Sequence, residues 1–277
     1  MSLGAAGVRR LMDEHGLRPS KALGQHFVTD PNTLRRIVTL AGVGSSSRVV
    51  EIGAGLGSLT LALARTGAEV VAVELDRHLV PVLGSVVGGE PNVRVVEADG
   101  LSVDWGRLLD PPGPWMLVAN LPYNVATPIV LRVLEEAPLV RSMLVMVQRE
   151  VAERLAAGPG DRACGAVSVK VAYWARAAVV AVVPPTVFVP RPAVESALVR
   201  LERHGAPAVA PELVSYARLR TVVDAGFGQR RKMLRRSLAG VVAPEAFAEA
   251  GVDPTARAEE LGVEQWGALA GAGIARR

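Results

Sequence analysis

Short, almost continuously apolar runs alternate with helical patterns over the first two thirds of the chain, and this alternation restricts the fold more than any other feature. The runs predict buried strands at residues 48–52, 69–75, 93–98, 115–119 and 143–147. Helical patterns lie between them at residues 59–65, 78–87 and 128–136. Strands that alternate with helices in this way predict an α/β fold with a Rossmann-like, doubly wound and mostly parallel sheet.

The ends of this pattern predict an edge pair and a second domain. Apolar runs at 179–183 and 196–201, joined by a Pro-rich segment, predict an antiparallel pair at one sheet edge, and Asp30 followed by Pro31 predicts a helix start before the first strand. Residues 205–211 resemble a linker, and helices are predicted at 212–225, 228–238, 244–250 and 263–270. We therefore expect a sheet-containing domain over residues 1–204 and a small all-helical domain over residues 205–277.

Composition excludes several classes of protein. Half of the 277 residues are hydrophobic and 21% are charged, which is ample for a core and unlike a disordered chain. The longest apolar stretch, residues 177–183, is far shorter than the roughly 18 residues of a membrane-spanning helix. Charges interrupt the N-terminal segment, which argues against a secretory signal and predicts a cytoplasmic protein. The single cysteine, Cys164, and four scattered histidines show no metal-ligand spacing, so no metal is expected.

A glycine-rich turn follows the first predicted strand and indicates a nucleotide site. Gly53, Gly55 and Gly57 lie between a strand and a helix, where the backbone can approach a ligand. The dinucleotide fingerprint requires glycine where this chain has Ser58. Glu51, just before the turn, would repel a pyrophosphate but attract a cation. The pattern therefore favours S-adenosyl-L-methionine, whose sulfur is positively charged.

Two more carboxylates follow the next strands. Glu74 ends the second predicted strand, where it can accept hydrogen bonds from both ribose hydroxyls of a cofactor, and Asp99 follows the third, where it can accept one from the cofactor's adenine amine. With Glu51, they place three carboxylates at successive strand ends along the functional edge of one sheet. A single such carboxylate is often a helix cap, but three in this arrangement favour a binding site.

The segment Asn120-Leu121-Pro122-Tyr123 follows the fourth predicted strand and suggests the reaction. The exocyclic amine of adenine is a poor nucleophile because its lone pair is delocalised into the ring. If the Asn120 side-chain oxygen and a backbone carbonyl near Leu121 or Pro122 accept its two protons, the lone pair can point at a methyl group, with no strong base required. Tyr123 offers a face on which an extruded base can stack.

Five segments between about residues 18 and 240 form one recognisable pattern: Gly24-Gln25-His26-Phe27-Val28, Glu51-Ile52-Gly53-Ala54-Gly55-Leu56-Gly57-Ser58-Leu59-Thr60, Asn120-Leu121-Pro122-Tyr123-Asn124-Val125-Ala126-Thr127-Pro128, Phe188-Val189-Pro190-Arg191-Pro192-Ala193-Val194-Glu195-Ser196 and Phe227-Gly228-Gln229-Arg230-Arg231-Lys232. Together they resemble the ribosomal RNA adenine dimethyltransferases, which are class I methyltransferases, and most closely their bacterial small-subunit branch. The resemblance implies dimethylation of two adjacent adenines in the hairpin near the 3′ end of 16S rRNA, within an immature small subunit. Separately, no apolar stripe is left over after the core is assigned, so we expect a monomer.

The resemblance also implies roles for individual residues. His26 and Val28, where the family usually has Asn and Leu, would lie beside the methionine end of the cofactor, and Asn120 would bridge cofactor and target. Phe188 would be the second aromatic that sandwiches the target base against Tyr123. Arg191 would contact RNA, as would a basic run in the helical domain that consists of Arg230, Arg231, Lys232, Arg235 and Arg236.

Three other functions fit parts of the pattern. The related large-subunit methyltransferases that confer macrolide resistance share both motifs but more often have Asn-Ile-Pro-Tyr, so Leu121 favours the small-subunit branch. A non-catalytic ribosome assembly factor would not need Glu74, Asp99, Asn120 and Tyr123 intact, although an assembly role could coexist with catalysis. DNA adenine methyltransferases usually carry Asp or Ser before Pro-Pro-Tyr, so Asn-Leu-Pro-Tyr and the helical domain that follows the sheet argue against that function.

Overall fold

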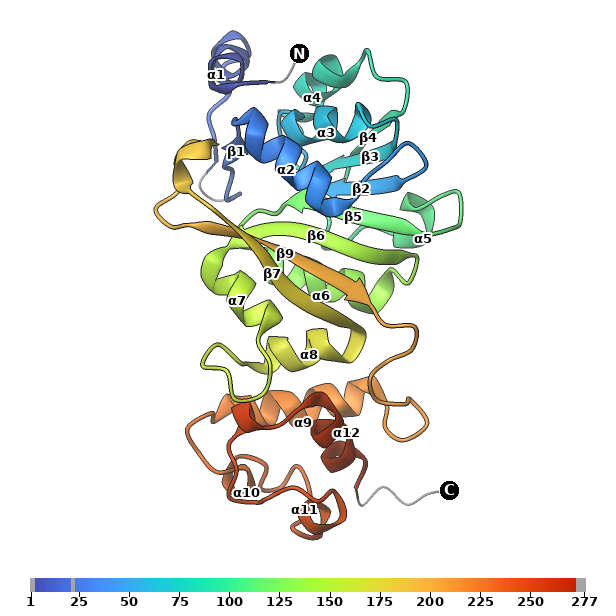
Figure 1. Cartoon of the computed structure of the whole chain (residues 1–277), viewed down its shortest axis with the longest axis vertical. Helices are drawn as coiled ribbons and strands as arrows, with labels where there is room; N and C mark the ends of the chain where they lie inside the picture. The colour runs from blue at the N-terminus through green and yellow to red at the C-terminus, as the bar shows by residue number, and fades with distance from the viewer. Residues whose placement is uncertain (1–2, 21–22, 273–277) are drawn as a thin grey trace. The chain divides into compact units, whose positions relative to one another are not determined.

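The structure is a computed structural model that describes residues 3–20 and 23–272 (Figure 1). Within these residues the main sheet has seven strands in the order β4-β3-β2-β5-β6-β9-β7, and β1 pairs with β8 in a separate two-stranded sheet. The main strands are β2 (Arg48–Ile52), β3 (Glu69–Glu74), β4 (Val93–Glu97), β5 (Trp115–Asn120), β6 (Val140–Gln148), β7 (Ala175–Val183) and β9 (Ser196–Arg203), and the short ones are β1 (Phe27–Val28) and β8 (Phe188–Val189).

The strand pairings confirm the predicted α/β sheet. β2 pairs in parallel with β3 on one side and with β5 on the other, so the order of the chain reverses at β2. β4 and β6 extend the parallel part outward, whereas β9 runs antiparallel to β6. β9 and β7 are neighbours at the sheet edge, where the two apolar runs were expected. Ligands bind at such a reversal point, beyond the carboxyl ends of the strands.

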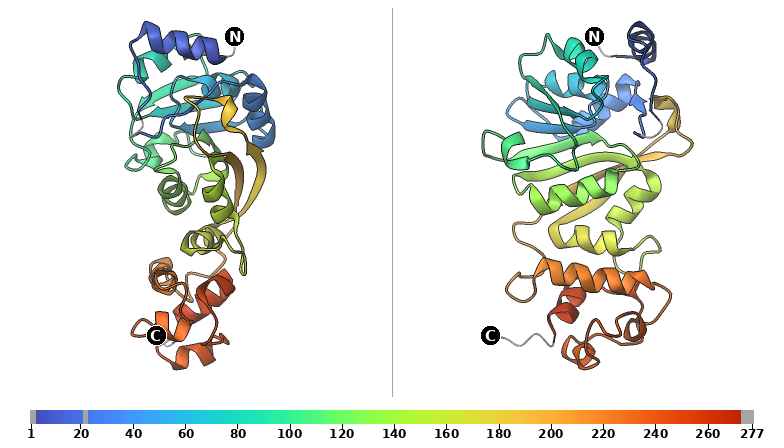
Figure 2. Two further views of the ribbon diagram at one scale, coloured as in Figure 1. Left: turned by 90° about the vertical axis from the view of Figure 1, so that its left-hand side faces the viewer. Right: turned by 180° about the vertical axis from the view of Figure 1, so that it is seen from behind.

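Helices cover both faces of the sheet. In Figure 1, α2 lies in front of the strands, whereas α6 is visible in the view from behind in Figure 2. The apolar side of α2 buries Leu34 and Ile37 against sheet residues such as Val118, and Asp30 caps its N-terminus as predicted, with Oδ2 accepting from the Thr33 N–H at 2.8 Å. The helices of this part of the chain are α1 (Ala5–Glu14), α2 (Pro31–Ala41), α3 (Ser58–Ala64), α4 (Val80–Val87), α5 (Trp105–Leu108) and α6 (Ala126–Glu136).

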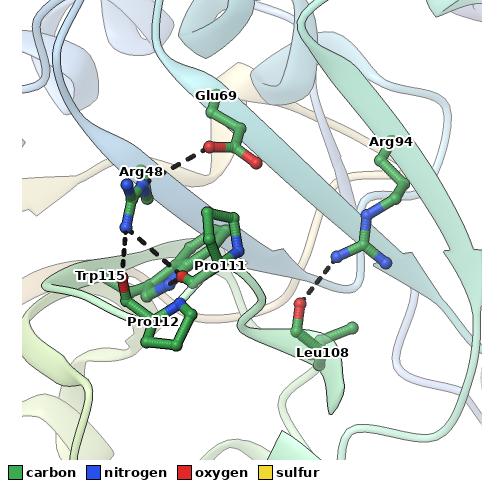
Figure 3. A network of polar contacts seen from close by, with 7 residues as sticks. All are labelled: Arg48, Glu69, Arg94, Leu108, Pro111, Pro112 and Trp115. Atoms are coloured by element: carbon green, nitrogen blue, oxygen red, sulfur yellow. Dashed lines mark hydrogen bonds and ion pairs between the residues drawn. The ribbon is translucent and has the colours of Figure 1, made fainter. Parts of the chain in front are cut away.

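The amino ends of the strands are held by a polar network that takes no part in the candidate site (Figure 3). Arg48 begins β2; its Nη1 donates to the Pro112 carbonyl at 3.0 Å, and its Nε lies 3.6 Å from a carboxylate oxygen of Glu69, the first residue of β3. Trp115 begins β5, and its indole N–H donates to the Pro111 carbonyl at 3.3 Å. These contacts fix the loop before β5 at the edge opposite to the glycine-rich turn.

The described residues form two compact units. The first comprises the chain up to Ala152 together with Ala178–Glu202, and the second comprises Glu153–Ala177 together with the chain from Arg203 onward. The core of the second unit surrounds the fully buried Trp266. Its helices, including one that begins in the first unit, are α7 (Arg149–Ala156), α8 (Ala166–Trp174), α9 (Tyr216–Gly228), α10 (Leu234–Ser237), α11 (Glu245–Glu249) and α12 (Val263–Gly271), and 3-10 turns occupy Pro185–Val187 in the first unit and Ala258–Glu260 in the second.

The structure corrects several predicted elements. The helix predicted at 228–238 is wrong: α9 ends at Gly228, residues 229–233 form a turn, and only the short α10 follows. The cause is Met233, which has an extended backbone and forms a β-bridge with Arg257. α9 also begins at Tyr216, later than predicted, because Ser215 caps it. The sequence pattern had assigned no helix to the segments that form α7 and α8.

Candidate functional site

The glycine-rich turn connects β2 to α3 and brings the backbone close to two neighbouring segments. Gly53 and Gly55 have φ angles of 76° and 57°, a region that favours glycine. A Cβ atom at Gly55 would lie 2.9 Å from Cε1 of Phe27, and one at Gly53 would lie 3.2 Å from Cδ of Pro122. The turn therefore fits against β1 and the Asn120–Tyr123 segment only because these positions lack side chains.

A cavity of about 170 Å³ opens at this turn, at the carboxyl ends of β2, β3, β4 and β5. The reversal of strand order at β2 places the four strand ends side by side. Ten of the residues predicted for cofactor and target binding line the cavity: His26, Val28, Gly53, Gly55, Glu74, Asp99, Asn120, Leu121, Pro122 and Tyr123. The structure thus brings together side chains that are up to 97 positions apart in the sequence.

Two of the cavity's carboxyl groups are buried. Glu51 is 2% exposed, and its Oε2 accepts a hydrogen bond from the Thr60 hydroxyl at 2.6 Å. Burial raises the pKa of Glu51 to about 8; the Thr60 bond lowers it, and the nearby Glu74 raises it further. Glu51 is therefore largely protonated near neutral pH when no cation faces it.

Glu74 is held by backbone donors at the end of β3. Its Oε2 accepts from the Gly55 N–H at 2.7 Å, and its Oε1 accepts from the Asp76 N–H at 2.9 Å. Burial raises the pKa of Glu74, and these backbone hydrogen bonds oppose that rise. Both bonds fix the carboxylate plane against the glycine turn, while carboxylate oxygens keep capacity to accept from a second donor.

Asp99 is partly exposed in the loop after β4. Its Oδ1 accepts from the Leu101 N–H at 2.8 Å, and its backbone carbonyl accepts from the N–H groups of Ser102 and Val103. The loop therefore turns tightly around Asp99 and holds its carboxylate at the cavity wall.

Asn120 ends β5 and presents a buried acceptor. Its Nδ2 donates to the His26 carbonyl at 2.8 Å, which fixes the orientation of the amide. Its Oδ1 is buried and has no hydrogen-bond partner among the described residues. An unpaired buried acceptor costs about 1–3 kcal/mol, and a ligand N–H that reaches this oxygen recovers that energy. The arrangement suits a donor in the cavity.

Tyr123 lies beside Asn120 and is half-buried. Its hydroxyl shares a hydrogen bond of 2.7 Å with Oγ of Ser196, and its ring stacks against His26, with ring centroids 5.2 Å apart. Burial raises the pKa of Tyr123, and the Ser196 bond opposes that rise, so the hydroxyl stays protonated at neutral pH. Tyr123 is a fixed aromatic surface in the cavity lining.

Two residues predicted from the family resemblance lie elsewhere in the same unit. Phe188 is 3% exposed and packs in the core with Leu34 and Ile37, because β8 pairs with β1 and directs this side chain inward. It is not among the residues that line the cavity, and its stacking on the target base stays a prediction. Arg191 is exposed in the loop after β8, where an RNA phosphate could reach it.

The basic run of the helical unit divides into two groups. Arg230 is tied to its own unit, because Nε lies 3.2 Å from Oε2 of Glu259 and Nη2 donates to the Arg162 carbonyl at 2.8 Å. The other basic residues of the run are exposed on the 229–233 turn and α10, and they are Arg231, Lys232, Arg235 and Arg236.

Sequence reasoning missed three side chains that organise the site. Ser196, Thr60 and Gln25 lie within the motifs quoted above but had received no role; Gln25 donates to Oδ2 of Asp76 at 3.0 Å. A polar residue at the first position of an apolar strand was the available signal for Ser196. Across residues 3–20 and 23–272, no cluster of His, Cys, Asp and Glu could hold a metal ion, and no helix is long and apolar enough to cross a membrane.

The chain is similar to proteins of one family along most of its length. It is 48% identical over 273 residues to "Ribosomal RNA small subunit methyltransferase A" of Cutibacterium acnes, covering 94% of this chain and 91% of the relative, and 49% identical over 269 residues to the protein of that description from Nocardia farcinica, with the same coverage. The crystal structure of the 23S rRNA methyltransferase ErmE superposes with a TM-score of 0.68 at 28% identity, covering 88% of this chain and 98% of that one. The family described as "Ribosomal RNA adenine dimethylase" matches residues 16–271. With the fold, the cavity and this match in agreement, the chain belongs to the ribosomal RNA adenine dimethylase family.

Proposed function

We propose that this protein transfers methyl groups from S-adenosyl-L-methionine to the N6 amines of two adjacent adenines in the 3′-terminal hairpin of 16S rRNA, giving N6,N6-dimethyladenosine in an immature small subunit. The observation that carries the proposal is the unpaired, buried Oδ1 of Asn120 at the wall of the cavity, with its amide held in one orientation by the His26 carbonyl.

The lining of the cavity suits this cofactor. When bound, S-adenosyl-L-methionine supplies an electrophilic methyl group on a positively charged sulfur. Glu51 and Glu74 supply the cavity lining with carboxyl groups that favour a cation and can accept hydrogen bonds from hydroxyls. Gly53 and Gly55 have positive φ angles and no side chains, so a ligand can approach the backbone closely there. Asp99 would accept a hydrogen bond from the cofactor's adenine amine.

The chemistry requires orientation of the amine rather than a strong base. Asn120 Oδ1 accepts a hydrogen bond from one N6–H, and a carbonyl of Leu121 or Pro122 accepts one from the other, so the nitrogen lone pair is free to form the new N–C bond. The S–CH3 bond would break in the same step, and S-adenosyl-L-homocysteine would be the leaving product. The departing amine proton passes to solvent after transfer. A monomethylated amine still has one N–H for Asn120, which permits the second methylation at the same site. Such positioning in a preorganised polar site accounts for much of the rate in enzymes of this kind.

The choice of small-subunit RNA is supported by sequence similarity. Relatives described as small-subunit methyltransferases are 48–49% identical to this chain, compared with 28% for the 23S rRNA methyltransferase. Leu121 in the Asn-Leu-Pro-Tyr motif agrees with this preference. Within the proposal, residues 1–204 bind the cofactor and carry out the transfer, residues 205–277 bind rRNA, and the protein acts as a monomer.

The proposal is tested by mapping methylated adenines. The protein is incubated with isotopically labelled S-adenosyl-L-methionine and, separately, with undermethylated small subunits and with free large-subunit RNA, and the products are mapped by mass spectrometry. We expect two adjacent dimethyladenines in the 3′-terminal small-subunit hairpin. Transfer only to large-subunit RNA, or binding to small subunits without transfer, would overturn the assignment.

A further inference from the structure

Tyr123 is held from two directions: by Ser196, to which no role was given above, and by His26, which was expected only to lie beside the cofactor. At its tip, the hydroxyl shares a hydrogen bond of 2.7 Å with Oγ of Ser196, a side chain that is completely buried at the start of β9. Ser196 lies opposite Gln148 in the β6–β9 pair, so its position is set by the sheet. The phenol is therefore anchored to a rigid element rather than to a loop.

The face of the Tyr123 ring is held by His26. The two ring planes are inclined by 28° with centroids 5.2 Å apart, which is a stacked pair in direct contact, so no third ring fits between them. The histidine is itself oriented, because its Nδ1 lies 2.8 Å from the Pro190 carbonyl and must donate to it. The His26 carbonyl in turn accepts from Asn120, which links the stacked pair to the proposed amine-binding amide.

We infer that His26 and Ser196 are positioning residues that make Tyr123 a stacking surface with a single usable face, so that the target adenine must stack on the side away from His26. The inference rests on the proposed function. The ring that packs against Tyr123 from behind is His26, so the opposite face of the phenol is the one left for the target base.

Orientation, rather than affinity, is the quantity that these contacts should control. Removing the Ser196 hydroxyl frees the phenol tip, and removing the His26 ring frees its back face. In both cases the base would still enter, but it would sample positions in which its amine is misdirected from the methyl group. The expected loss therefore falls on kcat, while KM for RNA remains within about twofold.

A double-mutant cycle between Tyr123→Phe and Ser196→Ala tests the contact at the tip. Each single variant should lower kcat for methylation of undermethylated small subunits by about tenfold, the size expected for one buried hydrogen bond. Because both variants break the same bond, the double variant should lose no more than either single one. Losses that multiply to about a hundredfold would show that Ser196 does not act through Tyr123 and would overturn the inference.

The face contact is tested by two substitutions of His26. Because His26 also lines the cofactor cavity, kcat is measured at saturating S-adenosyl-L-methionine. His26→Ala should lower kcat about tenfold, whereas His26→Phe, which restores a stacking ring without the nitrogen atoms, should recover most of that loss. With 2-aminopurine in place of the target adenine, His26→Ala should also show weaker quenching of fluorescence on binding, a signal that reports stacking directly. Equal activity of the Ala and Phe variants, or unchanged quenching, would contradict the role of the ring.

Ser168→Ala is the matched control for loss of a buried hydroxyl. Ser168 is 2% exposed, and its Oγ donates to the Arg154 carbonyl at 2.6 Å in the second unit. This variant should lose thermal stability but keep the wild-type kcat. If the proposed function is wrong, the wild-type protein itself transfers no methyl group to small subunits. If only this inference is wrong, the wild-type protein is active and the losses of the two single variants multiply in the double variant.

Discussion

Glu51 shows how a single buried side chain can link pH to stability. The end of β2 carries this carboxyl group into the interior because the strand's own apolar residues, Val49 and Val50, are completely buried on either side of the sheet. Burial raises the pKa of Glu51 to about 8, and the hydrogen bond from the Thr60 hydroxyl compensates for only part of the lost hydration. The group is kept where a cationic ligand would favour its ionised form.

The wild-type protein should lose stability relative to Glu51→Gln as the pH rises. The folded state holds the Glu51 proton up to a pH of about 8, whereas the unfolded chain releases it near the ordinary value of 4.5. The stabilising effect of the raised pKa is thus complete below about pH 4.5 and is lost through about pH 8, a change on the order of a few kcal/mol. Urea unfolding of both proteins at several pH values measures the difference between their free energies of unfolding. A difference that does not change with pH would contradict the prediction.

The positions of the candidate site residues were predictable where they depended on strand ends and were not where they depended on pairing between distant segments. Glu74, Asp99 and Asn120 follow directly from a parallel sheet, because carboxyl ends of parallel strands share one edge, and the structure places all three at the cavity. The direction of Phe188 depends on the pairing of β8 with β1, more than 150 positions earlier in the chain, which no local pattern specifies.

At the scale of elements, the basic segment after α9 shows why charge and shape must be considered together. Helical spacing suggested one continuous basic helix, but the β-bridge between Met233 and Arg257 interrupts it. The resulting turn keeps Arg230 against Glu259 and leaves the neighbouring basic side chains exposed. A turn can present adjacent charges to a phosphate backbone on one side, which a helix would distribute around its axis.

Neutralising the exposed group should lower the salt dependence of RNA binding. The quadruple alanine variant of Arg231, Lys232, Arg235 and Arg236 should reduce the slope of log K against log salt by up to roughly three to four, because each phosphate contact contributes about 0.7–0.9. Filter binding of the 3′-terminal hairpin RNA across a salt series measures the slope. An unaltered slope would show that this surface is solvated and does not contact RNA.

Two control proteins sharpen this test. Arg107→Ala with Arg141→Ala removes exposed arginines from α5 and from the amino end of β6, away from the cavity edge, and should leave the slope unchanged. Arg230→Ala should chiefly lower the free energy of unfolding, since that side chain is bonded to Glu259 and to the Arg162 carbonyl.

At the scale of the whole molecule, the sheet architecture was predictable and the division of the chain was less so. The alternating apolar runs predicted where the strands of the parallel sheet lie in the sequence, because strands buried on both faces need apolar residues at almost every position. The segment 153–177 contributes α8 to the second unit, and its Gly158-Pro159-Gly160-Asp161 turn marks a loop without indicating to which unit the following helix belongs. Its membership depends on contacts with residues that follow Arg203, and such contacts are not encoded in local periodicity.

The central claim is that Asn120 orients the target amine while other parts of the protein hold the RNA. The most direct test measures methyl transfer and RNA binding in the same Asn120→Ala protein, with Asn92→Ala as the control, because the Asn92 amide donates only to the Ala64 and Ala68 carbonyls in a structural role. We predict that Asn120→Ala lowers kcat by at least about 10²–10³-fold with RNA affinity within about twofold of the wild type, and that Asn92→Ala keeps its kcat. Unchanged turnover of Asn120→Ala would contradict the account.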